Sequence, residues 1–225
     1  MIRIILVLLI TTLATAAHAG DRFITLASTT STQNSGLYDY LLPLFTAKTG
    51  IDVRVISVGT GQAITIAKNG DADVLLVHHR PSEDAFVADG YGIERRDVMY
   101  NDFAVVGPNS DPAAISSKTK VSDGLKAINE TQSLFISRGD ESGTHKREKE
   151  LWAKANIVPI GNWYRDIGAG MGAALNMASS MNAYTLSDRG TWLSFGNKGD
   201  LSLLLSGDEA LFNPYGIILV NPAKH

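Results

Sequence analysis

Hydrophobic and polar positions along the chain follow two periods that alternate from residue 22 onward. Apolar residues recur at helical spacing in "GLYDYLLPLFTAKTG" (36–50) and "GQAITIAKNG" (61–70), which predicts helices. Three short apolar segments, "RFITLAS" (22–28), "IDVRVISVG" (51–59) and "DVLLVHH" (73–79), predict strands. A further helix is expected at 82–90, capped by Ser82. This alternation predicts an α/β fold with largely parallel sheets.

The stretch "MYNDFAVVGPNSDP" (99–112) divides the pattern into two halves. It predicts a strand and then a break rich in proline, glycine and asparagine, which is typical of a connection between lobes. The alternation then restarts, with helices predicted at 121–130, from Ser142, at 171–182 and at 188–195, and strands at 134–137 and 183–187. No convincing strand is expected in "NWYRDI" (162–167). Segments 201–207 and 211–220 are strand-like, and the second is placed to return to the first lobe.

The first residues have the pattern of a secretory signal peptide. Arg3 supplies a positive start, Ile4 to Ile10 form an apolar run, and Ala17 to Ala19 offer a cleavage site. The run is much shorter than the ~20 apolar residues that cross a bilayer. Cleavage after Ala19, which removes residues 1–19, is therefore predicted. Because the chain contains no cysteine, we expect a periplasmic protein without disulfides. The formal net charge of −3 argues against general binding to nucleic acid.

Three predicted strand-to-helix loops share a small, hydroxylated and glycine-rich composition. They are "ASTTSTQNSG" (27–36), "SVGTGQA" (57–63) and "SRGDESGTH" (137–145). Glycine lets backbone N–H groups turn toward a ligand, and Ser and Thr hydroxyls add donors of short reach. In α/β folds ligands bind beyond the carboxyl ends of strands, and a loop of this kind at a helix N-terminus favours an anion. Ordinary helix capping is the alternative for any single loop.

The helix after the third loop breaks the usual charge rule for helix starts. Helix N-termini carry partial positive charge and normally acidic side chains, but His145, Lys146 and Arg147 occupy these first turns. Arg138 lies just ahead of them. A bound dianion would explain why this positive charge is tolerated, with Asp140 holding the Arg138 guanidinium in place. A solvated helix face is the alternative for Lys146 and Arg147.

These loops and other stretches resemble the tungstate-binding component of bacterial ABC importers, a family of periplasmic type II solute-binding proteins. The matching stretches keep the family's order over nearly the whole chain: "STTSTQNSGL", "SVGTGQA", "GYGIERRDVMYNDFAVVGP", "SRGDESGTH", "GAGMGAALNMAS", "AYTLSDRGTW" and "NPYGIILVNP". Ser28 stands where the family usually has the first of three threonines. The resemblance implies ligand donors at Thr29, Thr30, Ser31, Thr60, Arg138, Ser142, Gly143 and Thr144, with Asp140 supporting Arg138.

The same resemblance implies an architecture and a set of partners. Two α/β lobes, residues 20–104 with 213–225 and residues 105–212, would be joined by two crossing strands and close on the oxoanion. Tungstate or molybdate is the expected ligand, and the sequence does not distinguish them. The expected partner is the membrane permease of an ABC importer. We expect a monomer without catalytic activity, without a cofactor and without a bound metal ion, tungsten entering only as its oxoanion.

The chemistry of the loops suits such a ligand. Tungstate is a fully deprotonated tetrahedral dianion at neutral pH, so its site should present donors only, as hydroxyls, amides and one arginine do. A receptor for phosphate or sulfate is the alternative, because "RGDxSGT" is similar to the loop of phosphate-binding proteins. Those proteins have an aspartate after the third strand, where this chain has His78 and His79. Whether either histidine touches the ligand stays open.

A dinucleotide-dependent enzyme is the alternative from another class. "GAGMGA" (168–173) fits a loose phosphate-binding fingerprint, and Asp188 follows after a predicted strand. Export to a compartment poor in nucleotides, the lack of a strand at 162–167 and the lack of a nearby base–nucleophile pair oppose this interpretation. Glycines that allow close packing near the cleft are the simpler interpretation.

The last strand-like segment raises an expectation about stability. In the resembled family, a helical region follows the stretch that matches "NPYGIILVNPAKH" and completes a lobe. Ile217 to Val220 are apolar on consecutive positions, so their strand should need cover on both faces. We therefore expect the form ending at His225 to be less stable and more prone to association than a longer relative.

Overall fold

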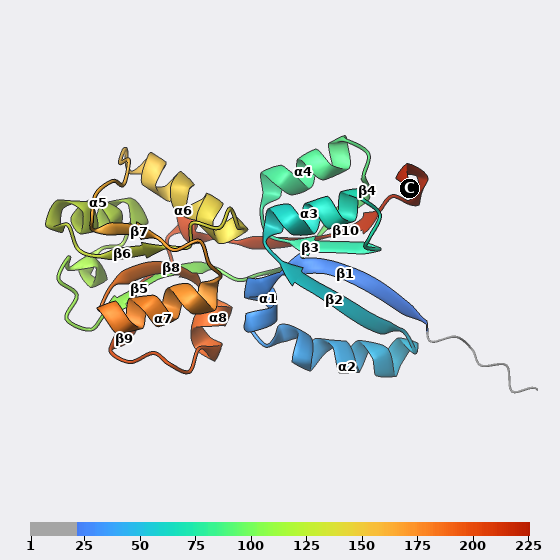
Figure 1. Ribbon diagram of the computed structural model, residues 1–225, viewed down its shortest axis with the longest axis horizontal. Helices are drawn as coiled ribbons and strands as arrows, with labels where there is room; N and C mark the ends of the chain where they lie inside the picture. The colour runs from blue at the N-terminus through green and yellow to red at the C-terminus, as the bar shows by residue number, and fades with distance from the viewer. Residues whose placement is uncertain (1–21) are drawn as a thin grey trace, which may run out of the picture.

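The computed structural model describes residues 22–225, which form two lobes side by side, each built on a five-stranded sheet (Figure 1). The first sheet has the order β2-β1-β3-β10-β4, with β1 (Phe23–Thr29), β2 (Asp52–Val58), β3 (Val74–Val77), β4 (Gly92–Tyr100) and β10 (Pro214–Val220). The second has the order β7-β6-β8-β5-β9, with β5 (Phe103–Pro108), β6 (Phe135–Ser137), β7 (Tyr164–Asp166), β8 (Tyr184–Asp188) and β9 (Leu201–Leu205). The predicted signal peptide, residues 1–19, lies outside the described residues.

Both sheets are mixed rather than largely parallel. In the first, β1 pairs in parallel with β2 and β3, whereas β10 runs antiparallel to β3 and β4. In the second, β6 pairs in parallel with β7 and β8, whereas β5 runs antiparallel to β8 and β9. The reason is that β5 and β10 each enter their sheet from the other lobe. A strand entering at the end where its neighbours finish must run in the opposite direction.

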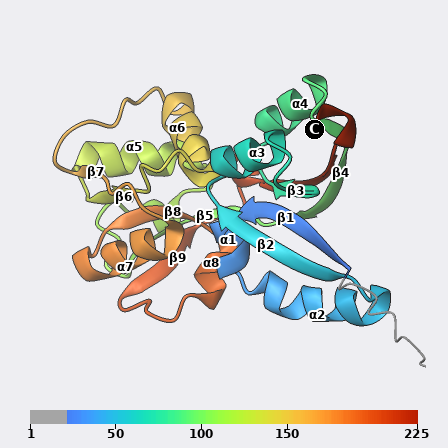
Figure 2. The ribbon, with the colours of Figure 1, turned by 45° about the vertical axis from the view of Figure 1, so that its right-hand side comes forward.

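Helices cover both faces of the first sheet. On one face lie α3 (Thr60–Lys68) and α4 (Arg80–Ala88), whose Ala63, Ala67 and Phe86 pack against Leu75 and Ile218 of the sheet. The other face is covered by α2 (Leu37–Thr49), through Tyr38 and the half-buried Leu42. Figure 2 shows α2 on the opposite side of the sheet from α3 and α4.

The second sheet is enclosed in the same way. One face carries α5 (Val121–Thr131) and α6 (Gly143–Lys154), and the other carries α7 (Met171–Met181) and α8 (Arg189–Ser194). Trp152 and Trp163 lie in the first of these two cores and Trp192 in the second. Short 3-10 turns at Ile115–Ser117, Glu209–Leu211 and Pro222–Lys224 complete the described chain.

Sequence patterning missed two strands, and both are edge strands. The segment 162–167, where no strand was expected, contains β7, and "GIERRDVMY" forms β4. An edge strand has only one neighbour and tolerates charged side chains that obscure the alternation of apolar residues. One of the charged side chains of β4 is paired inside the protein: Arg95 Nε donates to the buried Glu83 of α4 at 2.6 Å.

Two helix starts also differ from the sequence-based expectation. Thr30–Asn34, expected to be loop, form a short helix, α1. The helix predicted to be capped by Ser82 begins at Arg80, with His79 at its N-cap. Ser82 Oγ lies 2.6 Å from His79 Nδ1 instead, so the serine holds the residue that precedes the helix.

Two segments cross between the lobes, one after β4 and one before β10. They run side by side, because Asn101 N donates to Asn213 O at 3.0 Å and Asn213 Nδ2 donates to Asn101 O at 2.9 Å. Within residues 22–225, no helix combines the length and the hydrophobicity that crossing a membrane requires.

Candidate functional site

The predicted loop after β1, which forms the short helix α1, carries a cluster of hydroxyl groups. Thr29 is the N-cap of α1, and its Oγ1 accepts a hydrogen bond from Thr32 N at 3.4 Å. The same oxygen lies 3.1 Å from Ser31 Oγ. Thr29 and Ser31 are buried and Thr30 is half-buried. The second lobe reaches this loop through α8, where Thr191 Oγ1 donates to Ser31 O at 3.2 Å.

The loops after β2 and β6 touch each other across the two lobes. Thr60 begins α3 and is fully buried, and its Oγ1 accepts a hydrogen bond from Gly143 N of α6 at 3.1 Å. A Cβ added to Gly143 would lie 2.8 Å from Thr60 Oγ1 and 2.9 Å from His78 Cε1. Only glycine therefore allows the lobes to approach this closely.

Arg138 follows β6 and is only 2% exposed. Its Nε and Nη2 donate to Asp140 Oδ2 at 3.1 and 2.5 Å, and its Nη1 donates to Thr144 Oγ1 at 3.3 Å. Asp140 Oδ1 accepts from Ser142 N at 3.2 Å. The carboxylate thus fixes both the guanidinium fork and the start of α6.

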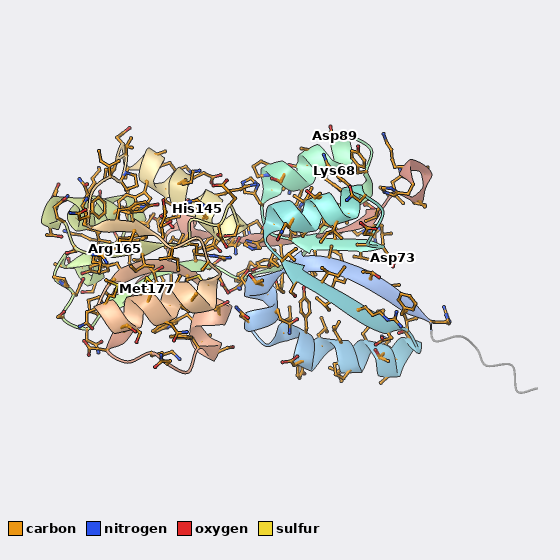
Figure 3. The ribbon with its side chains drawn as sticks, viewed as in Figure 1. Lys68, Asp73, Asp89, His145, Arg165 and Met177 are labelled. Atoms are coloured by element: carbon orange, nitrogen blue, oxygen red, sulfur yellow. The ribbon has the colours of Figure 1, made fainter. Side chains whose placement is uncertain are left out.

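The basic start of α6 has intramolecular partners. Ser142 is the N-cap and accepts from His145 N at 3.2 Å. His145 Nδ1 lies 3.1 Å from Glu141 N and 3.4 Å from Glu141 Oε1. Among the residues labelled in the second lobe of Figure 3, His145 lies nearest the first lobe. Arg147 Nη1 pairs with Glu150 at 2.9 Å and its Nη2 donates to Phe212 O at 3.1 Å. Two of the three basic side chains at this helix start, His145 and Arg147, therefore contact other groups of the protein.

His78, whose role the sequence left open, lies between these loops. It is 6% exposed, its ring stacks on Tyr215 with centroids 4.7 Å apart, and its Nδ1 lies 3.1 Å from Asn213 Oδ1. Its Nε2 lies 3.4 Å from Ser31 Oγ. Burial, opposed by the Asn213 hydrogen bond but reinforced by the Arg138 charge, lowers the pKa of His78 to about 4. The ring is therefore neutral at pH 7.

Asp188 is a buried carboxylate that the sequence did not connect with this site. It ends β8 and caps α8, and its Oδ1 accepts from Thr191 N at 2.9 Å and from Asn101 Nδ2 at 2.7 Å. Its Oδ2 is buried without a hydrogen-bond partner among the described residues. Burial raises its pKa, whereas these hydrogen bonds and the Arg138 charge act in the other direction. Its position after a predicted strand was the only sequence signal available.

The glycine-rich segment 168–173 lies beside the Arg138 loop. Contrary to the expectation, a strand, β7, precedes it, so that argument against a dinucleotide site fails. However, Ala169 N donates to Arg138 O at 3.0 Å, which joins this segment to the Arg138 loop. Gly139 adopts φ +61°, and a Cβ there would lie 2.9 Å from Asp166 Cβ. Gly139 therefore lets the two loops meet closely, whereas a Cβ at Gly168 or Gly170 would meet nothing within 4 Å.

A cavity of about 260 Å³ adjoins His78 and Gly143 between the lobes. Its walls include His79, Arg147 and Glu150, and His79 Nε2 lies 3.5 Å from Glu150 Oε1 across the two lobes. Burial, and next the charge of Lys146, lower the pKa of His79. In the part of the chain from 22 to 225, no group of three or more His, Cys, Asp or Glu side chains is placed to hold a metal ion.

Comparison with known proteins decides the family. A model of the PBP superfamily domain matches residues 14–225. The tungstate-binding protein TupA of Peptoclostridium acidaminophilum is 52% identical over 204 residues, covering 90% of this chain and 71% of that protein. This chain belongs to the tungstate-binding protein family of the PBP superfamily.

Solved structures agree with the tungstate-binding family. The tungstate ABC transporter protein of Geobacter sulfurreducens is 52% identical, with a TM-score of 0.84 over 90% of this chain and 86% of that one. The tungstate-binding protein TupA of Desulfovibrio alaskensis G20 is 44% identical, with a TM-score of 0.76 over 90% of this chain and 83% of that one. The predicted two-lobed type II fold is thereby confirmed, with mixed sheets.

Proposed function

We propose that this protein is a periplasmic receptor that captures tungstate between its lobes and delivers it to the permease of an ABC importer. The observation that carries the proposal is the contact between the lobes in which Gly143 N donates to the buried Thr60 Oγ1, next to Thr144, whose hydroxyl accepts from the buried Arg138 guanidinium. The identity of the anion is supported by the names of the relatives from Peptoclostridium acidaminophilum and Geobacter sulfurreducens. Because those relatives are binding proteins, we propose no catalytic step.

The proposed donors are neutral except for one. They are the hydroxyl and amide groups of Thr29, Thr30, Ser31, Thr60, Ser142, Gly143 and Thr144, together with the Arg138 guanidinium held by Asp140. Donors from a hydroxyl, an amide and an arginine suit an oxoanion that has no proton to donate in return. Burial strengthens each of these bonds, because the local dielectric constant is lower than that of water.

We further propose that the two lobes, one built on each sheet, move as units about the paired crossing segments at Asn101 and Asn213. Donors from both lobes reach the anion only when the lobes are together, so the bound form differs in shape from the empty one. A monomer presents that form to the permease. We propose that residues 1–19 direct export and are cleaved off after Ala19, which mass determination of the mature protein from a periplasmic extract tests.

Titration calorimetry with tungstate, molybdate, sulfate and phosphate tests the assignment. We expect tungstate to bind tightly, and phosphate and sulfate to bind more weakly by orders of magnitude. The molybdate titration shows whether the site distinguishes tungstate from molybdate. Phosphate as the preferred ligand would overturn the proposal. In that case Asp188 Oδ2, a buried carboxylate oxygen beside the site, would become the candidate acceptor for the phosphate proton.

A further inference from the structure

His78 contacts three parts of the molecule whose positions must fit together when an anion binds. Its Nε2 faces Ser31 in the loop after β1, and its Nδ1 faces Asn213 on the crossing segment. Its Cε1 lies against Gly143 of the second lobe, where no larger residue fits. Three contacts therefore hold one imidazole in a single orientation.

The contacts fix where the ring carries its proton. Asn213 Nδ2 donates to Asn101 O at 2.9 Å, which leaves Asn213 Oδ1 facing His78. An amide oxygen only accepts hydrogen bonds, so His78 Nδ1 must be the protonated nitrogen. With burial lowering the pKa of His78 to about 4, the ring is neutral and its Nε2 has a lone pair and no hydrogen. A hydrogen bond between Nε2 and Ser31 Oγ then needs the Ser31 hydroxyl as its donor, and this hydrogen is no longer directed at Thr29 Oγ1, 3.1 Å away.

This arrangement conflicts with the proposed role of Ser31. A serine hydroxyl has one hydrogen, and a Ser31 that gives it to His78 presents only lone pairs to an incoming anion. Turning the hydroxyl toward the anion leaves Nε2 as a buried acceptor without a donor, which is unfavourable. One added proton resolves both problems, because an Nε2–H can donate to Ser31 Oγ while the Ser31 hydroxyl donates to the anion.

We propose that His78 is a positioning residue that takes up one proton from solvent when the anion binds, and thereby turns the Ser31 hydroxyl toward the anion. The inference rests on the proposed function. The step is balanced: imidazole plus one proton becomes imidazolium, and no other bond forms or breaks. The dianion supplies the driving force, since it attracts the new positive charge and offsets that of Arg138.

Few charged groups face the His78 ring. Arg138, from the loop after β6, and His79, on the same segment, face His78 and both oppose its protonation. The rings of Tyr215 on β10 and Phe103 on β5 pack against it without charge. The bound anion therefore raises the pKa of His78 from about 4. The affinity for the anion should be constant well above the raised pKa, increase as the pH falls through it, and level off below about pH 4.

Calorimetry in buffers of different ionisation enthalpy measures this proton directly. Tungstate is titrated at several values from pH 8 to pH 6, and the slope of the observed enthalpy against the buffer enthalpy gives the protons taken up per anion. We expect an uptake that grows toward one as the pH falls, with Kd decreasing by at most about tenfold per pH unit.

Three variants separate His78 from its neighbours. In His78→Gln an amide N–H can donate to Ser31 but cannot titrate, so we expect binding within about tenfold of the wild type with no proton uptake. His79→Gln is the matched control, because the His79 nitrogens face Ser82 at 2.6 Å and Glu150 at 3.5 Å rather than the anion loop. His145→Gln is the second control. Both controls should retain the uptake, and melting curves verify that each variant is folded.

The outcomes are distinct. Tungstate binding by the wild-type protein without proton uptake overturns this inference and leaves the proposed function intact. Uptake that persists in His78→Gln, or disappears in His79→Gln or His145→Gln, assigns the proton elsewhere and also overturns it. Failure of the wild type to bind tungstate at all refutes the proposed function, and this inference with it.

Discussion

Replacing Arg138 with alanine removes the only formal positive charge proposed to contact the anion. The guanidinium has five N–H donors, and three of them are used by Asp140 and Thr144. Two donors, one on each terminal nitrogen, are left for an anion. A hydrogen bond to a charged group contributes about 1.5–3 kcal/mol, so two of them contribute about 3–6 kcal/mol, or a Kd increase of about 10²–10⁴-fold.

The substitution also exposes the anion to a carboxylate. Asp140 loses its partner in Arg138→Ala, and because its side chain is only 17% exposed, its charge is poorly screened. We therefore expect the upper part of that range, and a partial recovery of affinity in Arg138→Ala with Asp140→Asn. Arg138→Lys should recover little, since an ammonium lacks the planar fork that Asp140 holds.

Titration calorimetry with tungstate gives the affinities, and thermal melting without ligand shows whether each variant is folded. If Arg138→Ala binds tungstate as the wild type does but melts at a clearly lower temperature, the arginine supports the fold alone. The assignment of the loop after β6 to the anion would then be wrong.

Three further predictions follow from the same structure. Tungstate at 100 times its Kd should stabilise the fold by ~2.7 kcal/mol and raise Tm by on the order of 5–10 °C, whereas equal shifts with sulfate or phosphate and none with tungstate would contradict the proposed ligand. Gly143→Ala should weaken tungstate binding at least about tenfold because the added Cβ would meet Thr60 and His78, while Gly172→Ala, whose Cβ would meet only Asn34 at 4.0 Å, should bind normally in the same titration. Burial raises the pKa of Glu148 from 4.5 to about 7, so the folded protein binds more protons than the unfolded one between these values and its stability should fall as the pH rises through that window. Urea denaturation at pH 5 and pH 7.5 should show this loss in the wild type and a smaller one in Glu148→Gln; equal losses would exclude Glu148 as the cause.

The sequence predicted the parts of the fold that depend on burial. The strands at the centre of the sheets, such as Val74–Val77, are apolar throughout because helices cover them on both faces. The three loops were visible because glycine and small hydroxylated residues follow predicted strands. Strand direction was not visible, because it depends on which lobe a strand enters from. The edge strands β4 and β7 escaped detection because they carry charge.

The remaining features of the site arise from residues far apart in the chain. The role of His78 depends on Asn213, 135 positions later, and no local pattern reports that contact. Asp188 also depends on a residue far away in the sequence, because Asn101 of the crossing segment donates to its Oδ1. The positive charge that the start of α6 offers to an anion was overestimated for the same reason. Arg147 Nη2 donates to Phe212 O, and His145 Nδ1 lies 3.1 Å from Glu141 N, contacts that the local sequence does not indicate.

The position of β10 sets an order of events during biosynthesis. The second sheet comes from one continuous stretch, Phe103 to Leu205, and can assemble as soon as that stretch has emerged. The first sheet cannot, because β10 lies between β3 and β4 and pairs with both. Until β10 arrives, the wholly apolar β3 has an open edge of the kind that favours association with other chains. The lobe that begins first along the chain is therefore completed last, and newly made chains expose this apolar edge during that interval.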